Sequence, residues 1–138
     1  MYLLDTVTVS AMRRPEKAPA ALRRWVASVD PLQCFISVMT IFEVELGVRL
    51  LDRRDRLQAA PLREWIDRVL RPSFRSRLLP VDEPVAIACA GLHVPDPRAE
   101  RDALIAATAI VHGLTVATRN IRDFQGLPIA LVDPWQAG

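Results

Sequence analysis

Cysteine and lysine are scarce in this chain of 138 residues, which has two cysteines and, among its 18 Lys and Arg residues, the single lysine Lys17. Cys34 and Cys89 both lie in apolar segments, where a small buried side chain is a simpler explanation than a disulfide. We therefore expect a reducing, cytoplasmic location. The net charge of +2 is too small to indicate a nucleic-acid partner by itself.

Long apolar runs are also missing. The longest, ALIAATAIVHGLTVA at residues 103–117, is short for a membrane span and is interrupted by His112 and Gly113. No basic segment with a cleavage signal stands at the start, so we expect no membrane association. With 51% apolar residues the chain can build a core without disulfides or metal, and we expect one domain over residues 1–138.

Aromatic residues make up only 6% of the chain. Trp25 and Trp65 lie on apolar helical stripes, and we expect Phe42 to be in the core as well. A module that reads an RNA sequence normally displays aromatic side chains on which bases stack. The sequence therefore does not predict such a module.

Short apolar segments alternate with longer helical ones, which predicts a parallel sheet with helices on both faces. The short segments are mostly apolar throughout, as expected of strands covered on both sides. We predict five strands, at residues 2–6, 33–38, 77–81, 114–118 and 129–133. In such α/β folds, ligands bind at the edge where the strands have their carboxyl ends.

The helical segments carry start and stop signals such as an Asp cap, an early Pro and a final Gly. Pro61 marks a break or kink in the second arm of a predicted helical hairpin, and Gly113 marks the end of the last long helix. The expected helical segments are residues 18–30, 40–51, 53–70, 82–92 and 96–113.

Four acidic residues occupy unusual positions in this pattern. Asp5 follows the first strand, Glu43 lies early in a helix, Asp102 heads an apolar helical face, and Asp123 follows the fourth strand. Burying an unpaired carboxylate costs several kcal/mol, so an Asp at the end of a buried strand indicates a function. Helices that enter from the same edge can bring the four acids into one pocket.

Three of these acids also have a purely structural explanation. Thr40 and Glu43 have the spacing of a capping box. Asp102 lies one turn after Arg98 and near a helix start, where ion pairing and the helix dipole favour an acid. Asp123 fits an ordinary turn residue. The sequence by itself leaves these alternatives open.

Four segments of the chain form a combined pattern, in the order MYLLDT, TIFEVELG, RDALIAATAIVHGLTVATRNIRDF and IALVDP. This pattern resembles a PIN-domain ribonuclease, in particular the VapC or FitB type of toxin. The resemblance implies a three-layer PIN-like α/β fold with a central, mostly parallel five-stranded sheet and helices on both faces. It also implies a toxin of a toxin–antitoxin pair, an endoribonuclease that cleaves RNA phosphodiester bonds with metal-activated water.

The resemblance assigns a role to the four acids, because the corresponding carboxylates of PIN-domain nucleases hold divalent metal. Thr6 and Thr118 match hydroxyl positions beside that site, and Asn120 stands where many relatives have another acid. Mg²⁺ and Mn²⁺ both favour carboxylate and water oxygens. The expected metal-binding and catalytic residues are therefore Asp5, Glu43, Asp102 and Asp123.

Neither histidine offers a convincing alternative for catalysis. His112 falls in the last helical turn before Gly113, where it favours the helix dipole, and His93 lies in a loop. Hydrolysis at a metal site needs neither a histidine nor a cysteine nucleophile.

The resemblance further implies an RNA substrate, a small cognate antitoxin that often covers the active site, and a homodimer. Apolar residues of the helical hairpin suit a dimer surface, and they suit core packing nearly as well. These residues are Ile41, Val44, Val48 and Leu51.

One position departs from the family pattern. Val7 stands where many relatives follow Asp-Thr with Asn, which removes a polar group that could orient a carboxylate or a bound water. Together with Asn120, Val7 keeps an alternative open. In this alternative the chain is a PIN-like module that binds protein or RNA and cleaves weakly or not at all.

Overall fold

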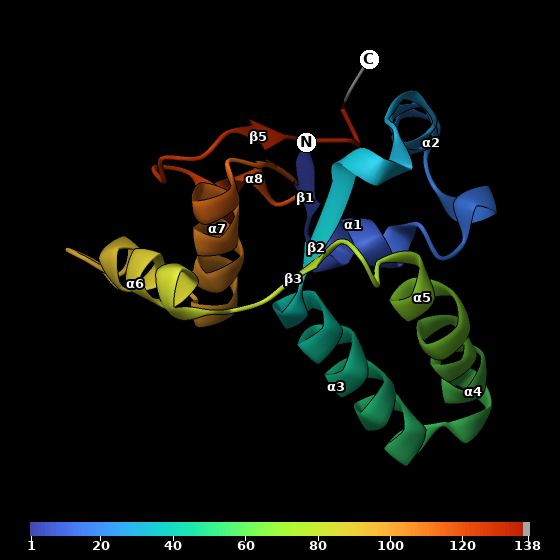
Figure 1. Cartoon of the computed structure of the whole chain (residues 1–138). Helices are drawn as coiled ribbons and strands as arrows, with labels where there is room; N and C mark the ends of the chain where they lie inside the picture. The colour runs from blue at the N-terminus through green and yellow to red at the C-terminus, as the bar shows by residue number, and fades with distance from the viewer. Residues whose placement is uncertain (137–138) are drawn as a thin grey trace.

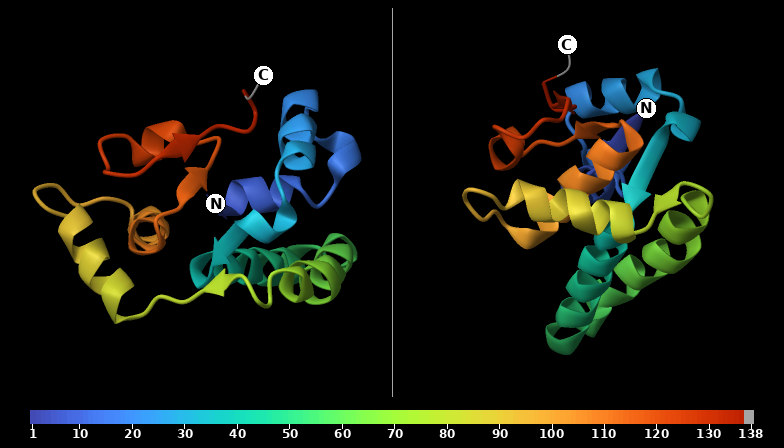
Figure 2. Two further views of the ribbon diagram at one scale, coloured as in Figure 1. Left: turned by 45° about the horizontal axis from the view of Figure 1, so that its top comes forward. Right: turned by 60° about the vertical axis from the view of Figure 1, so that its left-hand side comes forward.

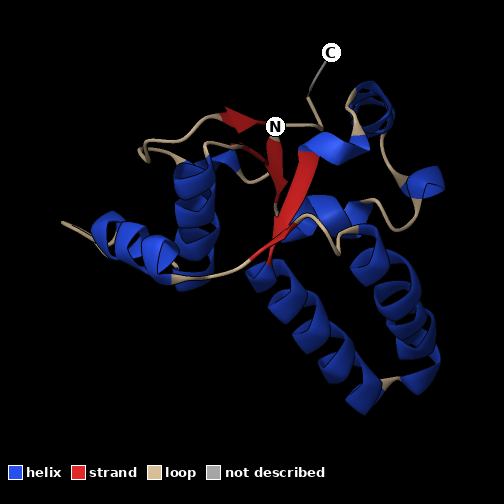
Figure 3. Ribbon diagram, viewed as in Figure 1, coloured by secondary structure: helices blue, strands red, loops and turns tan. Residues whose placement is uncertain are grey.

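The structure, a computed structural model, describes residues 1–136 around a five-stranded sheet in which every neighbouring pair of strands is parallel (Figures 1 and 3). Across the sheet the strand order is β3-β2-β1-β4-β5, so β1 is central. The predicted α/β fold is confirmed, and each predicted strand occurs in shortened form. The strands are β1 (Tyr2–Leu4), β2 (Cys34–Ser37), β3 (Leu78–Leu79), β4 (Thr115–Ala117) and β5 (Leu131–Val132).

Helices connect the strands. The α-helices are α1 (Thr6–Ala11), α2 (Ala20–Ser28), α3 (Val38–Arg54), α4 (Arg56–Trp65), α5 (Arg71–Ser73), α6 (Glu83–Leu92), α7 (Glu100–His112) and α8 (Ile121–Phe124). Shorter helical turns are η1 (Pro15–Lys17), η2 (Pro31–Gln33) and the π-helical η3 (Ile66–Leu70). In Figure 1, α3 and α4 project from the sheet as a hairpin.

Successive residues of β1 face opposite helical layers, as the pleat of a strand requires. Leu3 packs with Ile105 of α7, whereas Leu4 packs with Trp25 of α2 and Val44 of α3. Fully burying such a side chain contributes about 1.5–3 kcal/mol, so both layers hold the central strand in place. Figure 2 shows α7 on one side of the sheet and α1 and α2 on the other.

Helix α1 was not expected from the sequence, which placed residues 2–6 in one strand. Thr6, Val7, Thr8 and Val9 are all β-branched, and such residues favour strands. Asp5 reverses this preference by capping a helix, because its Oδ1 accepts a hydrogen bond from the Thr8 backbone N–H at 2.9 Å. The strand therefore ends at Leu4, one residue before the first of the four acids.

The start of α7 also differs from the prediction, which placed it at residue 96. Ala99 still has a non-helical backbone, and the backbone N–H of Arg98 donates to His93 Nδ1 at 3.1 Å. This contact holds the segment as a loop up to Glu100. The predicted end is confirmed, since Gly113 takes the left-handed conformation (φ 66°) that glycine adopts at low cost.

The helical hairpin of α3 and α4 is confirmed, but Pro61 does not break it. Helix α4 continues through Pro61 to Trp65 and passes into the π turn η3. Proline deprives the carbonyl of Leu57, four residues earlier, of its helical donor. Since Leu57 is exposed, water can satisfy that carbonyl.

The apolar residues of the hairpin that suited either a dimer surface or the core belong to the core. Val44 and Val48 are buried, and Ile41 and Leu51 pack against the same core cluster. They therefore give no support to a homodimer, which stays a prediction.

Both cysteines are free and buried, as expected. Within residues 1–136, no helix combines the length and apolar character needed to cross a membrane.

Candidate active site

Asp5 lies at the carboxyl end of β1 and is 5% exposed. Both of its carboxylate oxygens are engaged, since Oδ1 caps α1 and Oδ2 accepts a hydrogen bond from Thr118 Oγ1. Two hydrogen bonds compensate the burial of the charge and fix the orientation of the carboxylate. A carboxylate has about four acceptor positions, so Asp5 keeps lone pairs for a further ligand.

Thr118 lies at the carboxyl end of β4, the strand next to β1. Its Oγ1 accepts a hydrogen bond from the backbone N–H of Asn120 at 2.9 Å, which leaves its own proton directed to Asp5. Asn120 thus orients the Thr118 hydroxyl through its backbone N–H, and Asn120 itself is exposed to solvent. Of the three predicted supporting residues, Thr118 contacts Asp5 directly, Asn120 contacts Thr118 through its backbone, and Thr6 follows Asp5 in the chain.

Glu43 comes from the second turn of α3, which enters from the same edge of the sheet. Thr6 Oγ1 donates to Glu43 Oε1 at 2.8 Å and also lies 3.1 Å from Thr40 Oγ1. The capping-box alternative is wrong, because the N-cap of α3 is Ser37. Thr6 therefore links the residue after Asp5 to the carboxylate from α3.

Asp102 is the third residue of α7 and is half-buried. Burial raises the pKa of Asp102, and the negative charges of Asp123, Glu43 and Asp5 raise this pKa further. The three carboxylates are thus close enough to act on the fourth. Within residues 1–136 the Asp102 side chain makes no hydrogen bond or ion pair, so the alternative of pairing with Arg98 is wrong.

Asp123 lies on the short helix α8, after β4, and is exposed. Its backbone N–H donates to the Asn120 carbonyl at 3.0 Å, so its local geometry is that of a helix start. It lines a polar hollow together with Arg119 and Arg122. Asp123 is the most accessible of the four acids.

The donor chemistry of the four acids fits a divalent cation such as Mg²⁺ or Mn²⁺. As the side chains stand, no three His, Cys, Asp or Glu residues among the described part of the chain form a group that could hold a metal ion. Like charges repel in the absence of a cation, which keeps such side chains apart. A bound ion would therefore require the carboxylates to adjust.

Arg101 was not singled out from the sequence, although it directly precedes Asp102. Its Nη1 lies 3.8 Å from Glu43 Oε2, and its guanidinium carbon lies 4.9 Å from the ring centre of Phe42. The expectation that Phe42 is in the core is wrong, because Phe42 is 49% exposed. Its neighbour Glu43 points toward Thr6, and the position one residue earlier lies about 100° around the helix, which leaves Phe42 exposed beside it.

The model of the PIN domain family matches residues 2–128. The chain belongs to the PIN-domain family. Toxin FitB of Neisseria gonorrhoeae is 35% identical to this PIN domain over 98% of this chain and 99% of its own length. Ribonuclease VapC14 of Mycobacterium tuberculosis is 42% identical over 51% of this chain and 68% of its own.

Solved structures show the same PIN-like fold. The crystal structure of FitAcB from Neisseria gonorrhoeae matches with a TM-score of 0.88 and 35% identity, and 99% of each chain is covered. A toxin–antitoxin complex from Klebsiella pneumoniae matches with a TM-score of 0.69 and 25% identity over 97% of this chain and 98% of that one. The family expected from the four sequence segments is thereby confirmed.

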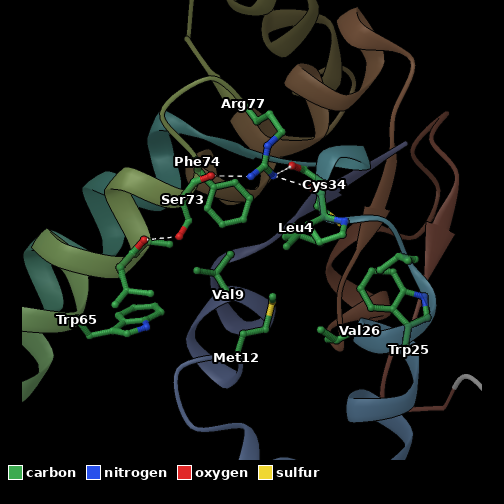
Figure 4. Close-up of a pocket in the computed structure, with 14 residues that line it drawn as sticks. Leu4, Val9, Met12, Trp25, Val26, Cys34, Trp65, Ser73, Phe74 and Arg77 are labelled. Carbon is green, nitrogen blue, oxygen red and sulfur yellow. Dashed lines mark hydrogen bonds between the residues drawn. The ribbon is translucent and has the colours of Figure 1, made fainter.

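The PIN domain also has an apolar cavity of about 210 Å³, and none of the four acids lines it (Figure 4). Figure 4 shows Trp65 and Phe74 on one side of the cavity, Trp25 and Val26 on the other, and Met12 between them. An apolar cavity of this kind suits an apolar side chain better than a phosphate. We therefore separate it from the candidate active site.

Proposed function

We propose that this PIN domain is a divalent-metal-dependent endoribonuclease and the toxin of a toxin–antitoxin pair. The observation that carries the proposal is the pair of hydrogen bonds at the carboxyl end of β1, where Thr118 holds Asp5 and the adjacent Thr6 donates to Glu43 of α3. In agreement with this arrangement, burial and the charges of Asp123, Glu43 and Asp5 raise the pKa of Asp102. Clustered carboxylates are unfavourable unless a cation neutralises them. The similarity to Ribonuclease VapC14 supports nuclease activity, and the similarity to Toxin FitB supports the role as a toxin.

Mg²⁺ or Mn²⁺ would be held by Asp5, Glu43, Asp102 and Asp123. When bound, the ion supplies a positive charge for the phosphate and lowers the pKa of a water molecule. The side chains of the chain itself orient the carboxylates. Thr118 and the backbone of Thr8 hold Asp5, whereas Thr6 holds Glu43.

Water, rather than the 2′-hydroxyl of the RNA, is the nucleophile that this site favours. Attack by the 2′-hydroxyl without a metal needs a general base such as a histidine near the phosphate. His93 Nδ1 is occupied by the Arg98 backbone N–H, and His112 ends α7, about 15 Å along the helix from Asp102 at 1.5 Å per residue. We therefore expect products with 5′-phosphate and 3′-hydroxyl ends.

The test is cleavage of defined single-stranded RNAs by the purified chain, with Mn²⁺, with Mg²⁺ and with EDTA. We expect cleavage with either metal, none in EDTA, and none with an Asp102→Asn variant purified in parallel. Products that end in a 2′,3′-cyclic phosphate would overturn the mechanism. A folded chain that binds RNA but never cleaves it would instead support the alternative of an inactive PIN-like module.

The partner that we propose is a small antitoxin protein. The solved toxin–antitoxin complex from Klebsiella pneumoniae supports this partner. The apolar cavity between α1, α2 and α5 offers such a protein an apolar contact surface outside the acidic site. Co-expression with the neighbouring short reading frame tests this proposal. The partner should copurify with the wild type and be lost from a Val26→Asp variant that a cooperative melting curve shows to be folded.

A further inference from the structure

Phe42 and Arg101 form a pair at the rim of the acidic site that the proposed hydrolysis does not use. Phe42 directly precedes Glu43 on α3, and Arg101 directly precedes Asp102 on α7. The guanidinium carbon lies 4.9 Å from the ring centre. The pair therefore bridges the two helices that supply two of the four carboxylates.

Both members of the pair are open to solvent. Phe42 is 49% exposed, and the Arg101 side chain is 47% exposed. Every other aromatic residue in the described part of the chain is buried or partly buried. Tyr2, for example, packs edge-on against Trp25 at 5.1 Å between ring centres. Within the described residues, Phe42 is thus the aromatic ring that is most open to a nucleic acid.

The contacts that Arg101 makes with Glu43 and Phe42 contribute too little stability to explain why this pair stands at the rim of the site. The ion pair of Arg101 with Glu43 is long, at 3.8 Å, and both partners are solvated, so it contributes little. An exposed cation–π contact is similarly weak. An exposed phenylalanine beside a cluster of carboxylates therefore calls for another explanation.

We propose that Phe42 and Arg101 bind one unpaired nucleotide of the RNA substrate, with the base stacked on Phe42 and its phosphate contacted by Arg101. This inference rests on the proposed ribonuclease function. Unpaired bases stack on aromatic rings, and the planar guanidinium of arginine matches a phosphate. Arg101 also supplies positive charge where the carboxylates would otherwise repel RNA. The pair makes the enzyme selective for single-stranded RNA.

Steady-state kinetics on a single-stranded oligouridylate with Mn²⁺ test the two roles. Stacking by one base predicts that Phe42→Leu raises KM about fivefold to tenfold or more. The value of kcat should stay within about twofold, since the carboxylates are unchanged. A Phe42→Trp variant keeps the stacking surface and should retain the wild-type KM.

Two control variants match these changes. Leu50→Ala alters an exposed apolar residue on the same helix, and Arg68→Gln removes an exposed arginine that, like Arg101, forms a weak ion pair, here with Glu64 at 3.7 Å. Both should keep the wild-type KM. Melting temperatures verify that every variant is folded.

Salt dependence separates the base contact from the phosphate contact. Loss of one phosphate contact should lower the slope of log affinity against log salt by about 0.7 for single strands, so Arg101→Gln reduces this slope and Phe42→Leu does not.

Affinity is measured in an Asp102→Asn background with an oligouridylate that carries one 2-aminopurine. Stacking on Phe42 should quench its fluorescence when protein is added, whereas protein should cause no further quenching of the same strand paired to its complement.

The outcomes keep this inference apart from the proposed function. A wild type that cleaves RNA while Phe42→Leu and Arg101→Gln behave like the two controls would overturn the nucleotide site alone. A wild type that does not cleave would overturn the ribonuclease, whereas quenching lost on Phe42→Leu would still support the nucleotide site. Equal cleavage and quenching of paired and unpaired RNA would overturn the selectivity.

Discussion

Thr6 Oγ1 lies 2.8 Å from Glu43 Oε1, so the residue that follows Asp5 positions a second carboxylate 37 places later in the chain. Thr6→Val keeps the shape of the side chain but removes this donor. Lost support for a ligating carboxylate typically costs about tenfold to a hundredfold in activity or metal affinity, and we expect a loss in that range. Thr6→Ser should restore activity. Cleavage rates and Mn²⁺ titrations measure both effects, and full activity of Thr6→Val would contradict the role.

Substituting Asp5, Glu43 or Asp102 by its amide should each reduce cleavage about a hundredfold or more, because each change removes a candidate metal-binding charge. Glu100→Gln is the matched control, since Glu100 is exposed and lies in the same first turn of α7 as Asp102. Cleavage of one RNA at saturating Mn²⁺ measures the losses. An equal loss in Glu100→Gln would indicate general unfolding instead.

Asp102→Asn should raise the melting temperature in EDTA. The raised pKa of Asp102 means that its ionised form opposes folding. This penalty is absent below the ordinary pKa of 3.8 and develops as the pH rises through the higher pKa of the folded chain. The advantage of Asp102→Asn should therefore be largest near neutral pH and vanish in acid. Melting curves across this range measure it.

Asp5→Asn should not stabilise the chain in the same way. Both oxygens of Asp5 already accept hydrogen bonds, and an amide nitrogen in place of Oδ2 would face the Thr118 hydroxyl proton. We expect a loss of about 1 kcal/mol in the free energy of unfolding in EDTA. An increase would show that charge repulsion outweighs these hydrogen bonds.

Mn²⁺ should stabilise the wild type against heat. At a hundredfold excess over its dissociation constant, one bound ion adds about 2.7 kcal/mol to the free energy of unfolding. Asp5→Asn and Asp102→Asn should lose most of this gain, whereas Glu100→Gln should keep it. Scanning calorimetry with and without Mn²⁺ compares the four proteins. The same gain in all four would place the ion elsewhere.

Glu45→Ala should weaken the helical hairpin. Arg63 binds the Glu45 carboxylate with two hydrogen bonds, of 2.6 and 3.0 Å, and lowers its pKa. The stabilisation, about 1 kcal/mol for a partly exposed pair, is present at neutral pH and lost as the pH falls through this lowered pKa. Glu64→Ala, from an exposed ion pair with Arg68, is the control in denaturant titrations.

The sequence by itself determined the alternation of strands and helices and the family, and it singled out the four acids as candidates for the site. Uniformly apolar strands are recognisable locally, because burial on both faces constrains every position in them. Gly113 is equally local, since the left-handed end of α7 selects glycine. Helix α1 was missed because its β-branched residues favour a strand, and only the cap by Asp5 decides otherwise.

Only the tertiary structure decided which partners each acid has. Glu43 has capping-box spacing, yet its hydrogen bond comes from Thr6, the first residue of α1, which packs against α3. The exposure of Phe42 and its contact with Arg101 depend on how α3 packs beside α7. A helical stripe shows which residues share a face, whereas the crossing of two helices determines which edge of that face is covered. That is why the carboxylates were recognisable from sequence and the pair at their rim was not.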